Sequence, residues 1–360
     1  VALSITRHNG TLHVGTTSGV FRLSREISAD GTVRPSFERV TALRAQAFAL
    51  LSHPDGLLTA TDRGVFQLTG GRARSVAESR TAYGLHASRH TDGLVYVGYI
   101  DGVGTMQYRN GRWESQPTIP GLDRGIFFLE EDDRGDLWVA SAYGGLWNVS
   151  TSDGLQNQPS VTEIASEGQR PQHVFRMAYV PENGLRIVTR NGVSRPERDE
   201  TGRIALLPDT SITSRLPADA GRVLNLTAAP DGDLWVTAEA ETYWFDRAAG
   251  RDVDVRVPFA HVPEFNAYAS RAEASGRFWV VGEEWVASHH PVTTSHELRP
   301  GRTLIRSVSL IRSDSVLFGG TEPMQGAPVR RPGALNVTGV DLERSTDQAD
   351  REQNDETSDV

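Results

Sequence analysis

The chain has 360 residues, a formal net charge of −9 and no cysteine. The lack of cysteine excludes disulfides, Cys-ligated zinc and thiol catalysis, and no apolar run is long enough for a membrane span. Residues 341–360 alone carry a net charge of −6, which leaves about −3 on the rest, so the basic surface that nucleic-acid binding requires is not expected. The first residue is Val1, and a piece of a longer protein is expected.

One short apolar pattern recurs along almost the whole chain, with successive copies 38 to 49 residues apart. In chain order, the eight copies fall at residues 12–16, 58–61, 95–99, 137–141, 185–189, 234–238, 278–282 and 316–320. Such a near-constant period indicates a repeat protein in which each repeat is one structural unit.

The flanks of each copy predict the strands of the unit. A turn signal such as Asp55-Gly56 precedes most copies, and a second glycine turn, such as Gly64, follows. Asp-Gly pairs supply the positive φ angles of tight hairpins. Another apolar stretch, such as residues 125–129, precedes the first turn, and a more polar stretch, such as residues 253–257, closes the unit. Each repeat is therefore predicted to be a four-stranded antiparallel meander.

The two faces of each predicted sheet decide the architecture. In the copy at residues 137–141, Trp138 points to one face and Leu137 and Val139 to the other. Because both faces are apolar, the sheets must pack on neighbours at both sides, as in a β-propeller. An open stack would need polar end repeats, whereas both end repeats are apolar. The prediction is an all-β fold with a single closed propeller of about eight blades over residues 1–340, seven being the alternative. Residues 341–360 are expected to form an acidic disordered tail or linker.

The repeats resemble the two-component regulator propeller family over residues 1 to about 340. Residues 130–141 match its acid-rich turn followed by Gly-x-Leu-Trp-Val, and residues 216–235 match its Leu-Pro lead-in and the same turn. The resemblance implies an extracytoplasmic sensor region, periplasmic or at the cell surface, that often binds oligosaccharides. The chain departs from the family in having one propeller instead of two in tandem, and in lacking the immunoglobulin-like module and the kinase.

Catalytic chemistry finds little support in the sequence. Asp133, Gly135 and Trp138 match only half of a sialidase Asp box, and paired catalytic carboxylates cannot be picked out. No His-Glu-x-x-His zinc motif and no Gly-x-Ser-x-Gly elbow occurs. No catalytic residue, metal site or cofactor is therefore predicted. A polysaccharide-active propeller enzyme is kept as the second alternative, after a scaffold that binds a protein partner.

Binding is expected on one face of the propeller. The segments that lead into the first strand of each sheet and the loops between the second and third strands reach the same face, and loops on a rigid scaffold commonly carry recognition residues. Aromatic, Arg and acidic side chains there suit a small polar ligand or an oligosaccharide. The predicted ligand-binding residues are Tyr83, Tyr99, Asp101, Arg124, Tyr143, His173, Arg190, Arg222, Glu241 and Trp285.

Overall fold

A computed structural model of the chain describes residues 1–27, 33–151, 159–164, 174–245, 258–259, 267–283, 285–290, 307–310 and 315–319. The chain divides into two compact units, Val1–Thr303 and Leu304–Val360. The predicted boundary at residue 340 and the predicted tail lie outside the described residues. Among the residues described, no helix has the length and hydrophobicity needed to cross a membrane.

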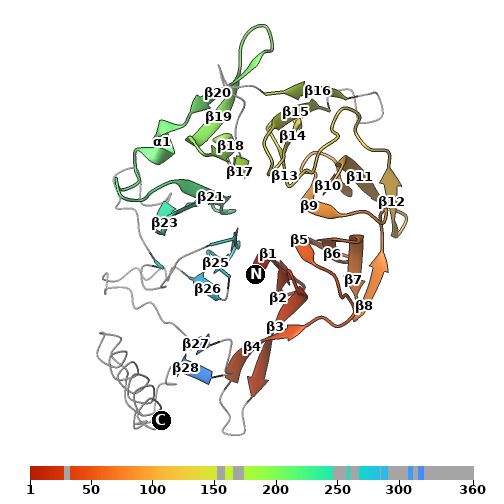
Figure 1. Cartoon of the computed structure of the whole chain (residues 1–360), viewed down its shortest axis with the longest axis vertical. Coiled ribbons are helices and arrows are strands. Elements are labelled where there is room, and N and C mark those ends of the chain that lie inside the picture. The colour runs from red at the N-terminus through yellow and green to blue at the C-terminus, as the bar shows by residue number, and fades with distance from the viewer. Residues whose placement is uncertain are drawn as a thin grey trace, which may run out of the picture. The chain divides into compact units, whose positions relative to one another are not determined.

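The first unit contains seven antiparallel sheets, each a meander whose strands pair in chain order (Figure 1). The first four sheets consist of β1 (Ala2–His8), β2 (Thr11–Thr16), β3 (Gly19–Ile27), β4 (Val33–Arg39), β5 (Ala47–His53), β6 (Gly56–Thr61), β7 (Gly64–Thr69), β8 (Arg72–Ser75), β9 (Ala82–Ala87), β10 (Leu94–Tyr99), β11 (Gly102–Arg109), β12 (Arg112–Gln116), β13 (Phe128–Glu131), β14 (Leu137–Ala140), β15 (Leu146–Ser150) and β16 (Ser160–Glu163). The other three consist of β17 (Val174–Val180), β18 (Gly184–Thr189), β19 (Gly192–Arg198), β20 (Ile204–Pro208), β21 (Val223–Ala228), β22 (Leu234–Ala238), β23 (Thr242–Phe245), β24 (Ala269–Ala272), β25 (Phe278–Val281) and β26 (Val286–His289).

The all-β propeller class predicted from the repeats is confirmed, and the described residues of the first unit form seven blades, the alternative count. Five sheets have four strands, and the sixth and seventh have three among the described residues. The eighth copy of the repeat falls on β28 (Ser315–Gly319), which pairs with β27 (Ser307–Leu310) in the second unit. The repeat pattern therefore predicted a hairpin that the structure contains.

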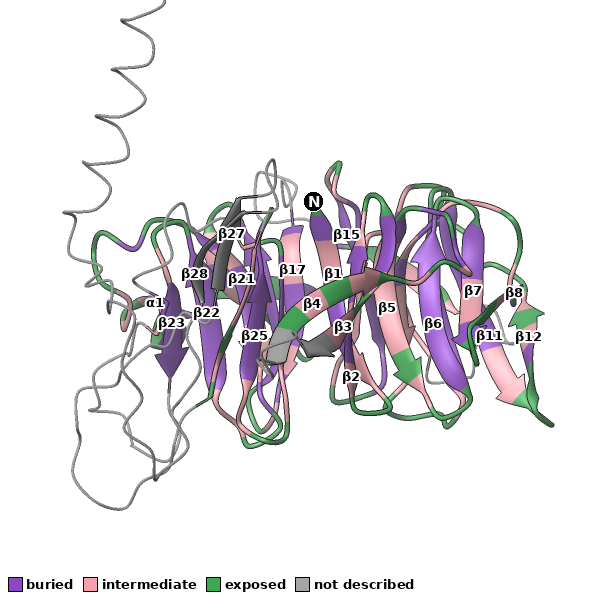
Figure 2. Ribbon diagram, turned by 90° about the horizontal axis from the view of Figure 1, so that it is seen from below, coloured by how far each residue is buried: buried purple, intermediate pink, exposed green. Residues whose placement is uncertain are grey.

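Each sheet buries both of its faces, as the Leu-Trp-Val pattern predicts. Trp138 on β14 is 1% exposed and packs in a cluster with Met177 and Ile187 of the fifth sheet. Leu137 and Val139 face the other way and pack against the third sheet. The second strand of a sheet is the most deeply enclosed, as β6 shows along its whole length (Figure 2). The indole of Trp138 thus packs between the fourth and fifth sheets.

The first and seventh sheets also pack against each other. Trp279 and Val281 of the seventh sheet share a cluster with Val14 of the first. Arg7 on β1 pairs with Glu273 at 2.7 Å. Closure of a propeller requires contacts of this kind between its first and last sheets. The residues that make them lie far apart in sequence.

The turn before Trp138 shows what the acid of the repeat motif does. The Oδ1 atom of Asp132 accepts the backbone N–H groups of Arg134 at 2.9 Å and Asp136 at 3.1 Å, and its Oδ2 atom accepts the indole N–H of Trp138 at 2.9 Å. Glu273 holds the indole of Trp279 in the same way at 2.9 Å. The acid of the motif therefore fixes turn and indole together, which is a structural role.

A short helix that the sequence did not predict joins the fifth and sixth sheets. The helix α1 (Thr210–Thr213) begins at Asp209, whose side chain accepts the backbone N–H of Ser211 at 3.0 Å. Asp209 is buried and also pairs with Arg186 of β18. One carboxylate thus caps the helix and compensates a buried guanidinium.

Candidate functional site

The segments predicted to meet on one face do meet there. We call the residues immediately before a first strand the lead-in, and the residues between the second and third strands the inner turn. Backbone hydrogen bonds join inner turn to lead-in in the third sheet, from Ile100 N–H to the Thr81 carbonyl at 3.0 Å, and in the sixth, from Glu239 N–H to the Arg222 carbonyl at 3.0 Å. We call this face the loop face.

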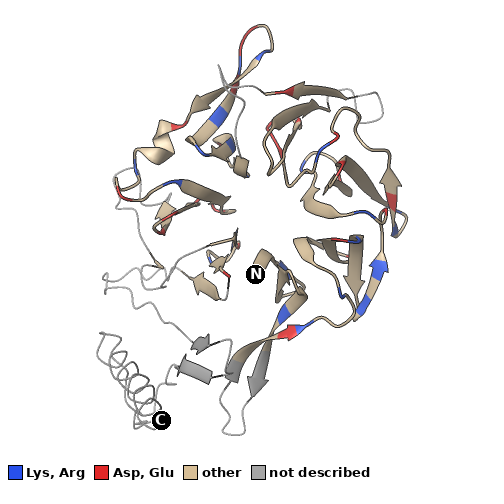
Figure 3. Cartoon of the chain, viewed as in Figure 1, with Lys and Arg blue, Asp and Glu red and all other residues tan. Residues whose placement is uncertain are grey.

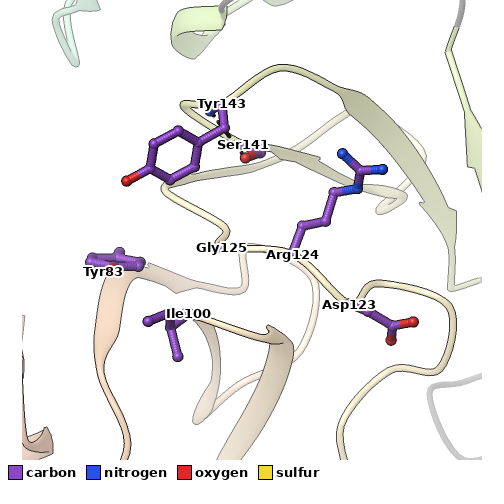
Figure 4. A pocket seen from close by; sticks show the side chains of 7 residues that line it. All are labelled: Tyr83, Ile100, Asp123, Arg124, Gly125, Ser141 and Tyr143. Atoms are coloured by element: carbon purple, nitrogen blue, oxygen red, sulfur yellow. Dashed lines mark hydrogen bonds between the residues drawn. The ribbon is translucent and has the colours of Figure 1, made fainter.

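Two open pockets on the loop face are built from these segments. The first, which we call the Tyr143 pocket, has a volume of about 320 Å³ and lies between the third and fourth sheets (Figure 4). It is lined by Tyr83, Ile100, Asp123, Arg124, Gly125, Ser141 and Tyr143. Three of these residues, from three different segments, were predicted from the sequence.

Tyr83 stands at an irregularity at the start of β9. The register of β9 against β10 shifts there, so that Gly98 pairs with Gly84 and Tyr99 with Ala82. Such a bulge re-aims the side chain of the extra residue. The Tyr83 ring stacks on Phe127 of the fourth sheet, with centroids 4.0 Å apart and planes 12° apart. Its position is therefore fixed by a neighbouring sheet.

Tyr143 projects from the inner turn of the fourth sheet. Gly144 and Gly145 have φ angles of +99° and +113°, which favour glycine, and the Ser141 Oγ atom accepts the Tyr143 N–H at 3.2 Å. The Tyr143 side chain is 80% exposed, and its ring lies 6.0 Å from that of Phe127, edge to face. The turn thus presents an aromatic ring to solvent beside the pocket.

Arg124 supplies the positive charge of the Tyr143 pocket. Two backbone hydrogen bonds fix the segment after it, from Ile126 N–H to the Tyr99 carbonyl at 2.9 Å and from Phe127 N–H to the Ala140 carbonyl at 3.0 Å. The side chains of Arg124 and Asp123 diverge (Figure 4). Within the described part of the chain, Arg124 forms no ion pair or hydrogen bond.

Tyr83 supplies the Tyr143 pocket with a hydrogen-bonding hydroxyl group. Burial raises the pKa of Tyr83, and the nearby Tyr143 adds to the effect. The Tyr83 phenol therefore stays protonated at neutral pH, able to donate as well as accept a hydrogen bond. Aromatic faces, hydroxyls and one guanidinium can together hold a ligand with both apolar ring faces and polar edges.

The second pocket, which we call the Arg222 pocket, lies on the same face between the fifth and sixth sheets and has a volume of about 370 Å³. The predicted residues Arg190 and Arg222 are both in its lining. Arg222 pairs with Glu239 at 2.5 Å, and its backbone N–H also donates to that carboxylate at 3.1 Å. Its charge is therefore already compensated inside the protein.

Tyr99, Asp101 and Trp285 are not among the residues that line these pockets. Tyr99 is 3% exposed and packs in the core between the second and third sheets, with the Arg80 guanidinium 3.8 Å from its ring centroid. Burial raises the pKa of Tyr99 to about 12. Asp101 pairs with Arg80 at 2.9 Å, and Trp285 packs against the core of the sixth and seventh sheets. The proposed ligand role of Tyr99 is therefore corrected to core packing.

Glu241 is not among the residues that line either pocket. Glu241 belongs to the inner turn of the sixth sheet, where its carbonyl accepts the Ala238 N–H at 2.8 Å. His173 lies outside the described residues.

The sequence reasoning missed Phe127, whose ring contacts those of Tyr83 and Tyr143. A signal for it exists in the repeat. In each of the seven sheets, a large apolar residue follows a small or branched one at the same repeat position. In five of these sheets, the register between the first and second strands shifts at this residue. The residues at this position are Leu3, Phe48, Tyr83, Phe127, Phe175, Leu224 and Tyr268.

Several solved structures are similar to this chain. The extracellular domain of the putative hybrid two-component system BT4673 from B. thetaiotaomicron is 13% identical, with a TM-score of 0.58 over 80% of this chain and 38% of that one. The corresponding domain of BT3049 from the same organism is 14% identical, with a TM-score of 0.54 over 78% of this chain and 38% of that one. A catalytically inactive virginiamycin B lyase from Staphylococcus aureus is 13% identical, with a TM-score of 0.53 over 78% and 91%.

At these identities, the similarity shows a shared propeller fold. The chain spans 38% of the length of the BT4673 and BT3049 domains that it matches. No family model matches the sequence, and no curated protein matches it either.

Proposed function

We propose that this chain is the ligand-binding propeller of an extracytoplasmic sensor, and that the Tyr143 pocket receives a ring of a small polar ligand such as an oligosaccharide. One observation carries the proposal. Three segments from two sheets bring Tyr83, Tyr143 and Arg124 around one open pocket on a rigid scaffold. Pockets that combine aromatic faces with a few polar groups are typical ligand sites.

Two further facts support the sensor role. The solved neighbours BT4673 and BT3049 are described as extracellular domains of hybrid two-component systems. The repeat motif resembles that of two-component regulator propellers, and the structure accounts for it through Asp132 and Trp138. Transmission of a signal from such a domain would depend on other parts of a larger protein.

We propose that the Tyr143 pocket binds its ligand without catalysing a reaction. The lining of the Tyr143 pocket includes a single carboxylate, that of Asp123, whereas most glycoside hydrolases use two. The virginiamycin lyase neighbour shares the fold with this chain, and its low identity transfers no reaction.

Replacing Tyr143 with alanine is expected to weaken ligand binding roughly tenfold, the loss of one aromatic contact. Because the side chain is 80% exposed, thermal stability should stay nearly unchanged. A glycan array identifies a ligand, and titration calorimetry measures the affinity of each variant. Tyr268→Ala is the matched control, since Tyr268 is a 47% exposed tyrosine of the seventh sheet outside the pocket lining.

Equal affinities for the wild type and Tyr143→Ala, with Tyr268→Ala weakened, would place the ligand elsewhere on the propeller. Absence of any bound glycan across the array would contradict the oligosaccharide reading itself.

A further inference from the structure

Three sheets tie their lead-in to their own inner turn through a carboxylate. In the second sheet, the Asp62 Oδ1 atom accepts the backbone N–H of Gln46 at 3.0 Å. In the third, Asp101 pairs with Arg80 at 2.9 Å. In the sixth, Glu239 pairs with Arg222 at 2.5 Å. The propeller therefore reuses one device on its loop face, an acid from the inner turn seated on the lead-in. Charged residues of both signs are spread over the sheets (Figure 3).

The strand register shows which residues of the fourth sheet take the place of that acid. Gly98, Ala140 and Thr237 occupy one repeat position, because each pairs with the first-strand residue that follows the bulge position. Counting two and three residues onward from each gives the inner-turn positions. These hold Ile100 and Asp101 in the third sheet, Ala142 and Tyr143 in the fourth, and Glu239 and Ala240 in the sixth.

The lead-in of the fourth sheet contains an arginine, but its inner turn has no acid at the two corresponding positions. Its lead-in contributes Arg124, as the third and sixth lead-ins contribute Arg80 and Arg222, while Ala142 and Tyr143 stand where the other turns place Asp101 or Glu239. Asp123 is the carboxylate next to Arg124 in sequence, and its side chain points away from the guanidinium (Figure 4). A pocket of about 320 Å³ opens at this place.

We infer that the Tyr143 pocket binds the carboxylate of an acidic sugar, with Arg124 as its partner. The ligand carboxylate takes on Arg124 the part that Asp101 takes on Arg80 within the protein. The acids at the corresponding place in the third and sixth sheets are carboxylates. A planar guanidinium pairs well with this group. The inference rests on the proposed function and names the class of its ligand.

The first test introduces an acid into the inner turn of the fourth sheet. Ala142→Glu copies the position of Glu239 and should pair with Arg124, so that it competes with the ligand. Ala142→Gln is the neutral control of the same size. The probes are trigalacturonic acid and its methyl ester, measured by titration calorimetry at low salt. The wild type should bind the acid at least about tenfold more tightly than the ester, and Ala142→Glu should lose this preference while Ala142→Gln keeps it.

A second variant tests the role of Arg124 without a substitution in the inner turn. Arg124→Gln changes an exposed side chain and should lower the affinity for trigalacturonic acid to that for the ester, with the ester unaffected. Equal binding of acid and ester by the wild type, with weaker binding by Tyr143→Ala, would overturn the carboxylate assignment and leave the proposed function standing. Failure of the wild type to bind either probe, or equally tight binding of a polyglutamate peptide, would also overturn the assignment of an acidic sugar.

Discussion

Replacing Trp138 with alanine is expected to destabilise the propeller by about 4 kcal/mol, the range for a large aromatic residue removed from a packed core. Trp138 is 1% exposed and packs against Met177 and Ile187 of the next sheet. Its indole N–H also donates to Asp132 at 2.9 Å. The substitution therefore leaves a cavity between two sheets and a partly buried acceptor without this donor. Urea unfolding followed by tryptophan fluorescence and circular dichroism measures the loss.

Two variants separate the contributions of Trp138. Trp138→Phe keeps an aromatic ring and removes the N–H, and should cost about 1–2 kcal/mol. Tyr143→Ala, in the same sheet but 80% exposed, should change the free energy of unfolding by less than about 0.5 kcal/mol. A loss below about 1 kcal/mol for Trp138→Ala would mean that the indole does not pack between sheets.

The strands were predictable because the repeat is local. A turn signal, an alternating apolar pattern and a second glycine turn mark each hairpin within about 20 residues, and Leu137, Trp138 and Val139 already show that both faces are covered. The number of sheets in the propeller was harder to predict. The hairpin of β27 and β28 has the same local pattern as the others, whereas the packing of the first sheet on the seventh joins residues far apart in sequence, such as Val14 and Trp279 of one cluster.

The site was predictable as a place and only in part as a set of residues. Chain topology alone brings lead-ins and inner turns to one face, and Tyr83, Arg124 and Tyr143 meet there. Tyr99 was misjudged because it was treated as a loop residue. It continues the alternation of Val95 and Val97, which lie in the same core cluster, and residues two apart on a strand share a face.

The direction of the Trp285 side chain could not be predicted from a sequence pattern. The glycine at position 282 leaves room that the Trp285 indole fills, since a Cβ atom built there would collide with the ring. The side chain therefore folds back onto its own sheet rather than toward solvent. Such a contact depends on how a particular turn folds over its own backbone.

Stability is expected to fall in acid because of Glu131, which is fully buried at the start of the turn that ends in Trp138. Its carboxylate accepts hydrogen bonds from Ser88 Oγ at 2.7 Å and from the Arg89 N–H at 2.6 Å. Burial by itself raises the pKa of this carboxyl, but the interactions with His86, Arg89 and Ser88 outweigh it and lower the pKa to about 2. The unfolded chain has the ordinary value of 4.5.

The sign of the pH dependence follows from this depressed pKa. The ionised form of Glu131 stabilises the folded state by about 3 kcal/mol above the ordinary pKa, and this contribution disappears as the pH falls toward 2. Glu131→Gln should therefore cost about 2–3 kcal/mol at pH 7, and its difference from the wild type should shrink by about half at pH 3. Urea unfolding at pH 7, 4 and 3 measures it. Glu114→Gln, at a partly exposed acid of β12, should show little difference at any pH. A cost for Glu131→Gln that is the same at pH 7 and pH 3 would mean that the buried group contributes by its shape and not by its charge.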